Sequence, residues 1–286
     1  MSPSVVTGTT SLYAVIGDPV RQARVPGLLN PLLPTWGVDA AVVPLQVRPA
    51  DFAEVIVALR RIPNLRGLFI TVPHKVAAGR FAARMSSRAT RAGCANVLRP
   101  EPGGGWYADN FDGIGFVAGL RAGGFDPAHK RVSLVGAGGA GAAIAVALLD
   151  AGAAELYVHD TDEVRCVDLV VRLMGGGPEG LGGGSLDDPA GIAQACGEPR
   201  LIEVDLVVNA TPLGLRPEDA LPFDPRKLAA GVVVADIIMH PAETALLRIA
   251  ASHGCRVHPG EPMLVHQLPC YRQFFGLGEP SSEPAC

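Results

Sequence analysis

Three glycines between residues 136 and 141 have the spacing of a turn that binds phosphate groups. They stand in the run Gly136-Ala-Gly138-Gly-Ala-Gly141, which has the pattern G-x-G-x-x-G. In such a turn the first glycine makes the tight bend, the second lets backbone N–H groups approach a pyrophosphate, and the third allows close packing of helix and strand. The N-terminus of the following helix attracts the anion. We therefore expect a dinucleotide to contact Gly136, Gly138 and Gly141, together with the intervening Gly139 and Ala140.

An acidic residue, Asp160, follows this turn at a distance of about 20 positions, as dinucleotide-binding units require. A carboxylate there accepts hydrogen bonds from ribose hydroxyls and repels a 2′-phosphate, which usually needs an arginine. The nearest cation downstream is Arg165. We therefore expect NAD as the cofactor, preferred over NADP. The alternative is that Asp160 only caps a helix that starts near Thr161.

The elements around the turn are those that such a unit needs. Residues 132–135 form an apolar, β-branched run typical of a strand, the alanine-rich run 142–149 favours a helix, and residues 156–158 predict a second buried strand. Two more apolar runs, 205–209 and 232–236, each end in a polar residue, as strands do at the ligand-binding edge of a parallel sheet. This predicts a Rossmann domain. A glycine-rich loop between core elements is the alternative, because the chain contains 35 glycines.

Strands and helices also alternate before the turn, which predicts a second α/β lobe with a mostly parallel sheet. The expected elements are strands at 13–16, 39–47 and 68–72, helices at 25–33 and 52–61, two short helical stretches up to about 91, and a β ribbon at 96–98 and 106–108. A last strand at 255–258 precedes one helix at 261–275.

The totals exclude several classes of protein. The chain has 286 residues, a net charge of -4 and 18% charged residues without a basic block, which argues against a nucleic-acid partner and gives no reason for a membrane partner. Its six cysteines have no C-x-x-C spacing, and its seven histidines form no metal-binding pattern. We expect a cytoplasmic protein with reduced thiols, no metal, and a monomeric or homodimeric state.

Eight polar motifs occur in an order and spacing that resemble the shikimate dehydrogenase family, which includes quinate dehydrogenases. The resemblance covers nearly the whole chain. The motifs are Gly17-x-Pro19, Thr71-Val-Pro-His-Lys75, Ala95-Asn96, Asp109-Asn-Phe-Asp112-Gly113, Gly136-Ala-Gly-Gly-Ala140, Asn209-Ala-Thr-Pro-x-Gly214, Asp236-Ile-Ile and Gly260-x-x-Met-Leu-x-x-Gln267.

The resemblance implies a two-lobed α/β enzyme. Residues 1–112 are expected to form a substrate-binding catalytic domain completed by about 254–286, with the C-terminal helix returning to it, and residues 113–253 the NAD-binding Rossmann domain. By this resemblance the site residues are the catalytic pair Lys75 and Asp112, the substrate-binding residues Thr71, Asn96 and Gln267, and the cofactor-binding residues Asn209, Thr211 and Gly260.

The chain departs from the family where a substrate carboxylate is held. Ala23 and Val25 stand where the family has a pair of serines, and losing two hydrogen bonds to a charged group would weaken binding by roughly 100- to 10,000-fold. The neighbouring Arg24 or Arg21 could pair with the carboxylate instead, although a solvated surface arginine is an equally good interpretation. The substitutions extend further into the expected pocket.

Phe69 and Phe111 replace an asparagine and a threonine of the family, and Met239 replaces a common tyrosine. We expect Phe69 and Phe111 to line a less polar pocket. The sequence therefore predicts an NAD(P)-dependent oxidoreductase acting on a small ring hydroxy acid, shikimate or quinate. The alternatives are a divergent paralogue acting on a less polar alicyclic alcohol, and a nucleotide-binding sensor without catalysis.

Overall fold

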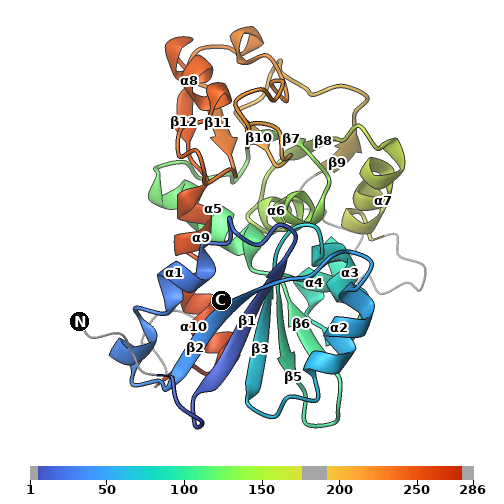
Figure 1. The fold of residues 1–286 in the computed structure, drawn as a ribbon. Helices are drawn as coiled ribbons and strands as arrows, with labels where there is room; N and C mark the ends of the chain where they lie inside the picture. Colours follow the sequence, from blue (N-terminus) through green and yellow to red (C-terminus); the bar gives the residue numbers. More distant parts are fainter. Residues whose placement is uncertain (1–5, 176–191, 279–286) are drawn as a thin grey trace. The chain divides into compact units, whose positions relative to one another are not determined.

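The computed structural model describes residues 6–175 and 192–278 (Figure 1). The chain forms two compact units, one made of two separate segments of the sequence and the other of a single continuous segment. The first consists of residues 1–111 together with 267–286, and the second of residues 112–266. Each unit is built on its own six-stranded sheet, in agreement with the two α/β lobes expected from the alternation of strands and helices.

The first unit contains a mixed sheet with short helices. Its elements are β1 (Ser11–Gly17), α1 (Val25–Leu29), η1 (Leu33–Trp36), β2 (Ala40–Gln46), α2 (Phe52–Leu59), β3 (Leu65–Ile70), α3 (Lys75–Arg80), β4 (Ala82–Met85), α4 (Ser87–Ala92), β5 (Val97–Pro100), β6 (Trp106–Asp109) and α10 (Leu268–Phe275). The strand order is β2-β1-β3-β5-β6-β4.

Strands β2, β1 and β3 are parallel, and β5 and β6 form the antiparallel ribbon that the sequence predicts. Strand β4 was not expected, because the sequence predicted only two short helical stretches between Lys75 and about residue 91. Four residues are too few to show a period of two, and this edge strand is set by its parallel pairing with β6.

The two faces of this sheet are covered by different helices. On one face, Phe52 and Ile56 of α2 pack with Leu68 and Ile70 of β3. On the other face, α10 brings the Phe275 ring to 5.0 Å from the Phe69 ring. Gly67 leaves room for that ring, since a Cβ atom at Gly67 would lie 2.2 Å from Phe275 Cε1.

The second unit contains a fully parallel sheet in the order β12-β11-β10-β7-β8-β9, the doubly wound arrangement of a Rossmann domain. Its elements are α5 (Asp112–Ala122), β7 (Arg131–Val135), α6 (Gly139–Asp150), β8 (Glu155–His159), α7 (Glu163–Leu173), β9 (Ile192–Ala195), β10 (Leu206–Asn209), η2 (Pro225–Lys227), β11 (Val233–Asp236), α8 (Ala245–Ser252), β12 (Arg256–His258) and α9 (Glu261–Val265).

The end of the chain differs from the expectation of one helix over 261–275. It forms two helices, α9 and α10, because Pro269 lies in the first turn of α10 and cannot continue a helix that enters from before it. Strand β12 pairs with β11, and α9 packs against α5. The chain therefore rejoins the first unit at residue 267, later than the boundary near 254 that the sequence had suggested.

Candidate active site

The glycine turn in the second unit has the geometry that its sequence requires. Gly136 has a φ of 106°, and a Cβ atom there would lie 2.8 Å from the carbonyl of Ala210. A Cβ atom at Gly141 would lie 1.9 Å from the Gly136 oxygen, so only glycine fits this contact between α6 and the turn. No atom lies within 4 Å of a Cβ built on Gly138, the residue that precedes α6. The turn is closed at Gly136 and Gly141 and open at Gly138, where a phosphate group can approach the backbone of Gly139 and Ala140 at the helix N-terminus.

Asp160 holds this turn in place. Its Oδ2 accepts a 2.7 Å hydrogen bond from the N–H of Ala137, and its Oδ1 accepts one of 2.9 Å from the N–H of Asp162. Asp162, rather than Asp160, caps helix α7 by accepting from Arg165 N–H, so the helix-capping alternative for Asp160 does not apply. The Arg165 guanidinium lies 3.5 Å from the Asp160 carboxylate.

A hydrogen-bonded network joins the ends of β10 and β11. The buried Asn209 side chain donates to Asp236 Oδ1 at 3.1 Å and accepts from the Thr211 hydroxyl at 2.7 Å. Thr244, the N-cap of α8, donates to Asp236 Oδ2 at 2.7 Å. Burial raises the pKa of Asp236, and the hydrogen bonds from Thr244, Ile238 and Asn209 oppose that rise. The network fixes the loop that carries Asn209 and Thr211 at the ligand-binding edge of the sheet.

The hydrogen bonds of Asp236 in this network were not visible in the sequence, where Asp236 was the polar end of a strand and the first residue of a family motif. Thr244 was missed altogether, although a threonine before an apolar helical run is a recognisable N-cap signal. Gly260 lies beside the same edge: a Cβ atom there would be 2.5 Å from the carbonyl oxygen of Ile237, which follows β11.

Lys75 and Thr71 lie on the turn between β3 and α3 in the first unit. Lys75 is the first residue of α3, is partly buried, and accepts a 2.9 Å hydrogen bond at its carbonyl from Ala95 N–H. Thr71 donates its N–H to Ile16 O at 2.9 Å. The His74 ring stacks on Phe52 at 4.4 Å and bonds to Val47 O through Nε2, so this turn is anchored by a buried imidazole.

Asn96 and Gln267 are brought together within the first unit. The Asn96 amide donates to Gln267 Oε1 at 2.9 Å, and Asn96 Oδ1 accepts from Phe111 N–H at 2.9 Å. The Tyr271 hydroxyl donates to the same Gln267 oxygen. Both amides are buried, with exposed fractions of 4% and 1%. The structure thus joins two residues that the sequence had assigned separately to substrate binding.

Asp112 is the first residue of α5 and belongs to the second unit, where it is 3% exposed. The next residue explains how the helix is seated. A Cβ atom at Gly113 would lie 2.0 Å from the Ala143 oxygen, so α5 and α6 pack backbone against backbone at this point. The position of Asp112 is therefore fixed by the helix that begins at the glycine turn.

Phe69 and Phe111 belong to an aromatic cluster with α10. Phe69 packs on Tyr271 at 4.9 Å, and Phe111 packs on Tyr271 at 5.9 Å and on Phe274 at 5.6 Å. Both rings are 2% exposed. This packing accounts for both phenylalanines without a substrate contact, and their role as pocket-lining residues stays a prediction.

Arg24 is an exposed residue at the N-cap of α1, next to Ala23 and Val25. Its role in binding a substrate carboxylate stays a prediction. The sequence did not point to a charged pair in the loop that carries Phe111. Asp109 is 4% exposed and accepts from Arg88 Nε at 2.8 Å and Nη2 at 3.0 Å, and the Arg88 guanidinium lies 5.1 Å from the centre of the Phe111 ring. This bidentate ion pair fixes the Asp109 side chain at the start of the Asp109–Asp112 loop.

Within residues 6–175 and 192–278, no cluster of three or more His, Cys, Asp or Glu side chains could hold a metal ion. Over the same ranges no helix combines the length and apolar character needed to span a bilayer. Cys94, Cys166, Cys196 and Cys255 form no disulfide, but Cys270 is disulfide-bonded, so the expectation that all cysteines are reduced is wrong for Cys270.

Known proteins resemble this chain in sequence and in structure. The family model described as the shikimate dehydrogenase substrate binding domain matches residues 15–98. A protein of Rubrobacter xylanophilus named shikimate dehydrogenase (NADP(+)) is 37% identical over 269 residues, covering 93% of this chain and 91% of that protein.

Two solved structures are similar over the whole fold. Quinate dehydrogenase from Corynebacterium glutamicum in complex with NAD has a TM-score of 0.78 and 27% identity, covering 95% of both chains. Ligand-free 5-ketofructose reductase of a Gluconobacter strain has a TM-score of 0.75 and 27% identity, covering 94% of both chains. With a two-unit α/β fold, a glycine turn on a parallel sheet and this identity over most of its length, the chain belongs to the shikimate dehydrogenase family.

Proposed function

We propose that this protein is a nicotinamide-dependent dehydrogenase that interconverts a ring secondary alcohol and its ketone, with shikimate or quinate as the alcohol. The observation that carries the proposal is the open backbone at Gly138, directly before the N-terminus of α6, in a turn closed by Gly136 and Gly141. This is the space that a pyrophosphate needs. Membership of a family of dehydrogenases supports the same activity.

The chain's own residues handle the proton and orient the substrate. When bound, the nicotinamide cofactor accepts or returns the hydride at the carbinol carbon. Lys75 takes the hydroxyl proton as the alcohol is oxidised and returns it in the reverse direction, with Asp112 as the second member of the catalytic pair. Asn96, Gln267 and Thr71 hold the ring hydroxyls, so that orientation supplies much of the rate.

A second substrate class is favoured by the residues at the expected carboxylate site. Ala23 and Val25 offer no hydroxyl, and a site that has lost such donors discriminates less strongly for a carboxylate. One solved structure with a similar fold is named 5-ketofructose reductase, a name that refers to a substrate other than shikimate or quinate. The alternative is therefore a ring alcohol or polyol with little requirement for a carboxylate, held by the same Asn96 and Gln267.

For the cofactor, we propose NAD over NADP because of the charge of Asp160. Its carboxylate is 9% exposed and is followed by Asp162 and Glu163, so a 2′-phosphate at this strand end would meet acidic groups. The names of the curated relatives point to NADP(+), and Arg165, 3.5 Å from Asp160, is the cation that would serve a phosphate. The quinate dehydrogenase neighbour, in contrast, is described in complex with NAD.

The test is the initial rate of nicotinamide reduction by the purified full chain, with shikimate and with quinate, each with NAD and with NADP. Turnover with either acid supports the proposal, and a higher kcat/KM with NAD supports the role of Asp160. Turnover of polyols or uncharged ring alcohols alone would select the second substrate class. Cofactor binding without turnover of any alcohol would select the non-catalytic sensor. The oligomeric state and the cytoplasmic location stay predictions from the sequence.

A further inference from the structure

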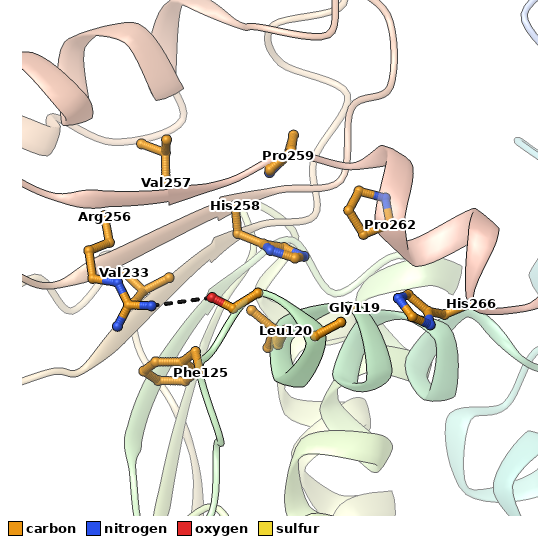
Figure 2. A pocket seen from close by; sticks show the side chains of 12 residues that line it. Gly119, Leu120, Phe125, Val233, Arg256, Val257, His258, Pro259, Pro262 and His266 are labelled. Atoms are coloured by element: carbon orange, nitrogen blue, oxygen red, sulfur yellow. Dashed lines mark hydrogen bonds between the residues drawn. The ribbon is translucent and has the colours of Figure 1, made fainter.

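The second unit contains a cavity of about 350 Å³ that no part of the proposed function uses. It is lined by the C-terminal half of α5, by strand β12 and by α9 with its flanking residues (Figure 2). None of the residues assigned above to the cofactor or the substrate lines it.

A buried histidine with an unused nitrogen faces this cavity. His258 is 8% exposed, and its Nε2 has no hydrogen-bond partner among the described residues. The Phe116 ring meets the imidazole edge-on, at 6.1 Å and 90°. Figure 2 shows the imidazole extending from β12 toward Gly119 and Pro262. A buried polar atom without a partner is unfavourable unless a ligand or water satisfies it.

Gly119 of α5 and Gly123, the residue that follows α5, leave the room for this imidazole. A Cβ atom at Gly119 would lie 2.9 Å from Pro262 Cβ and 3.4 Å from His258 Nε2, and one at Gly123 would lie 3.3 Å from His258 Nδ1. Glycine destabilises a helix relative to alanine. A larger residue at Gly119 or Gly123 would stabilise the helix but would crowd the His258 ring. The cavity is therefore shaped around the imidazole.

The ionisable side chains of the lining are all basic. Arg256 and His266 accompany His258, and no aspartate or glutamate lines the cavity. Arg256 Nη2 donates to the Gly123 and Gly124 carbonyls at 3.3 and 3.4 Å, and these bonds fix the guanidinium. Figure 2 draws the bond to Gly123 as a dashed line. A guanidinium has five N–H donors, so Arg256 can donate to these carbonyls and also donate hydrogen bonds to an anion.

The remaining walls are apolar. They are formed by Leu120, Phe125, Val233, Pro259 and Pro262. We propose that this cavity binds a small carboxylate with an apolar body: the carboxylate accepts hydrogen bonds from His258 Nε2 and from Arg256 or His266, and the body packs on Phe125 and Leu120. The proposal goes beyond the dehydrogenase reaction and does not depend on it.

The ionisation of His258 should make carboxylate binding depend on pH. Burial, and then the charge of His266, lower the pKa of His258. Other charged groups on the surrounding elements are Asp112 and Arg121 on α5, Asp236 on β11, Arg256 on β12 and Glu261 on α9. A bound carboxylate favours the imidazolium and opposes the effect of burial. Binding of the carboxylate should therefore strengthen as the pH falls from neutral toward mildly acidic values.

The test uses benzoate as the probe and benzamide as its uncharged counterpart, with the full chain. Histidine side-chain NMR signals are followed during each titration, with the His258 signal identified from the spectrum of His258→Gln. We expect benzoate to shift the His258 and His266 signals saturably, to leave the signal of the exposed His253, the C-cap of α8, unmoved, and to bind at least about tenfold more tightly than benzamide. Binding at any other site, including the substrate site, would not produce this pattern.

Variants provide the control. His258→Gln should weaken benzoate binding by about tenfold or more, whereas His253→Gln should leave it unchanged. If His258→Gln does not fold, the pH dependence in the unaltered protein decides, with tighter binding at lower pH expected. Equal affinity for benzoate and benzamide, unmoved His258 and His266 signals, or undiminished benzoate binding by His258→Gln would each overturn the proposal. Because the readout is binding, it is independent of whether any alcohol is oxidised.

Discussion

The side-chain amide of Asn96 donates a 2.9 Å hydrogen bond to the side-chain oxygen of Gln267, 171 positions further along the chain. Asn96 also accepts from the backbone of Phe111, and Gln267 accepts from Tyr271. These buried bonds tie β5, the Asp109–Asp112 loop and the start of α10 to one another. The two residues that the family resemblance assigns to substrate hydroxyls are thus also structural partners.

Replacing Asn96 should therefore reduce stability as well as substrate affinity. Asn96→Ala leaves the Phe111 N–H without its acceptor, and we expect the free energy of unfolding to fall by about 1–3 kcal/mol. Urea denaturation measures this. The exposed Asn64, whose 3.5 Å bond to Thr10 is weak, provides the control: Asn64→Ala should change stability by less than about 0.5 kcal/mol. Similar losses of unfolding free energy in the two variants would mean that the hydrogen bonds of Asn96 do not stabilise the fold more than the exposed bond of Asn64.

Lys75 should be required for turnover but not for folding or cofactor binding. We expect Lys75→Met to lower kcat by roughly 100- to 10,000-fold, the usual contribution of a general acid–base group, with cofactor affinity unchanged. Steady-state rates and a cofactor titration measure the two quantities. Lys227→Met, at an exposed position of η2, is the matched control and should keep full activity. A Lys75 variant that retained most of its kcat would remove Lys75 from the mechanism.

The charge of Asp160 should decide between the two cofactors. Asp160→Asn keeps an acceptor for the Ala137 N–H but removes the negative charge, so we expect the ratio of kcat/KM for NADP to that for NAD to rise about tenfold, equivalent to ~1.4 kcal/mol. Asp168→Asn, on the exposed side of α7, should leave the ratio unchanged. If the unaltered enzyme already strongly prefers NADP, the NAD assignment is wrong and Arg165 becomes the residue to replace.

Gly141 and Gly138 should respond differently to the same added methyl group. Gly141→Ala places a Cβ atom 1.9 Å from the Gly136 oxygen, and we expect a loss of about 3 kcal/mol or more in the free energy of unfolding. Gly138→Ala meets no atom within 4 Å and should fold normally, but it should weaken cofactor binding because the methyl group occupies the open face. Thermal denaturation with and without cofactor separates the two effects. Normal cofactor affinity in Gly138→Ala would show that the pyrophosphate lies elsewhere.

The buried carboxyl of Asp236 should make stability depend on pH in a direction unusual for an aspartate. Its pKa in the folded protein is raised above the ordinary value of 3.8 by burial, so its contribution is complete below pH 3.8 and is lost as the pH rises through the raised pKa. Asp236→Asn cannot ionise, and its stability relative to the unaltered protein should therefore improve as the pH rises over that range.

Unfolding by urea at a series of pH values measures this trend, and Asp219 supplies a control of opposite sign. Hydrogen bonds from the backbone of Arg216 and Gly214 lower the pKa of the Asp219 carboxyl, so its contribution is lost as the pH falls. Asp219→Asn should thus gain in relative stability toward low pH. The same trend in both variants would contradict the assignment for Asp236.

Much of the fold followed from local patterns in the sequence. The long apolar strands of both units and the Gly136–Gly141 turn were predicted because each carries a strong local pattern: a buried β-branched run, or glycines at fixed spacing. The short strands Ala82–Met85 and Ile192–Ala195 were not predicted, because four residues show no reliable period and their pairing is set by neighbours distant in the chain.

The candidate site shows the same division. The residue types of Lys75, Asp112 and Gln267 could be matched to motifs, but the hydrogen bond between Asn96 and Gln267 could not, since no local rule connects positions so far apart. The Arg88–Asp109 pair and the buried His258 also depend on tertiary packing. Such contacts are outside what spacing along a single chain can indicate.

Helix α10 is translated after every other described element, yet its rings cover Tyr13 and Phe69 of the first strands. While the ribosome is still producing residues 112–266, the aromatic face of β1 and β3 has no cover from its own chain. The second unit is continuous in sequence and can complete its sheet before the first unit can. A nascent chain that stalls before residue 268 should thus carry a finished Rossmann sheet beside an unprotected β-sheet face, the state in which aggregation or chaperone capture is most favoured.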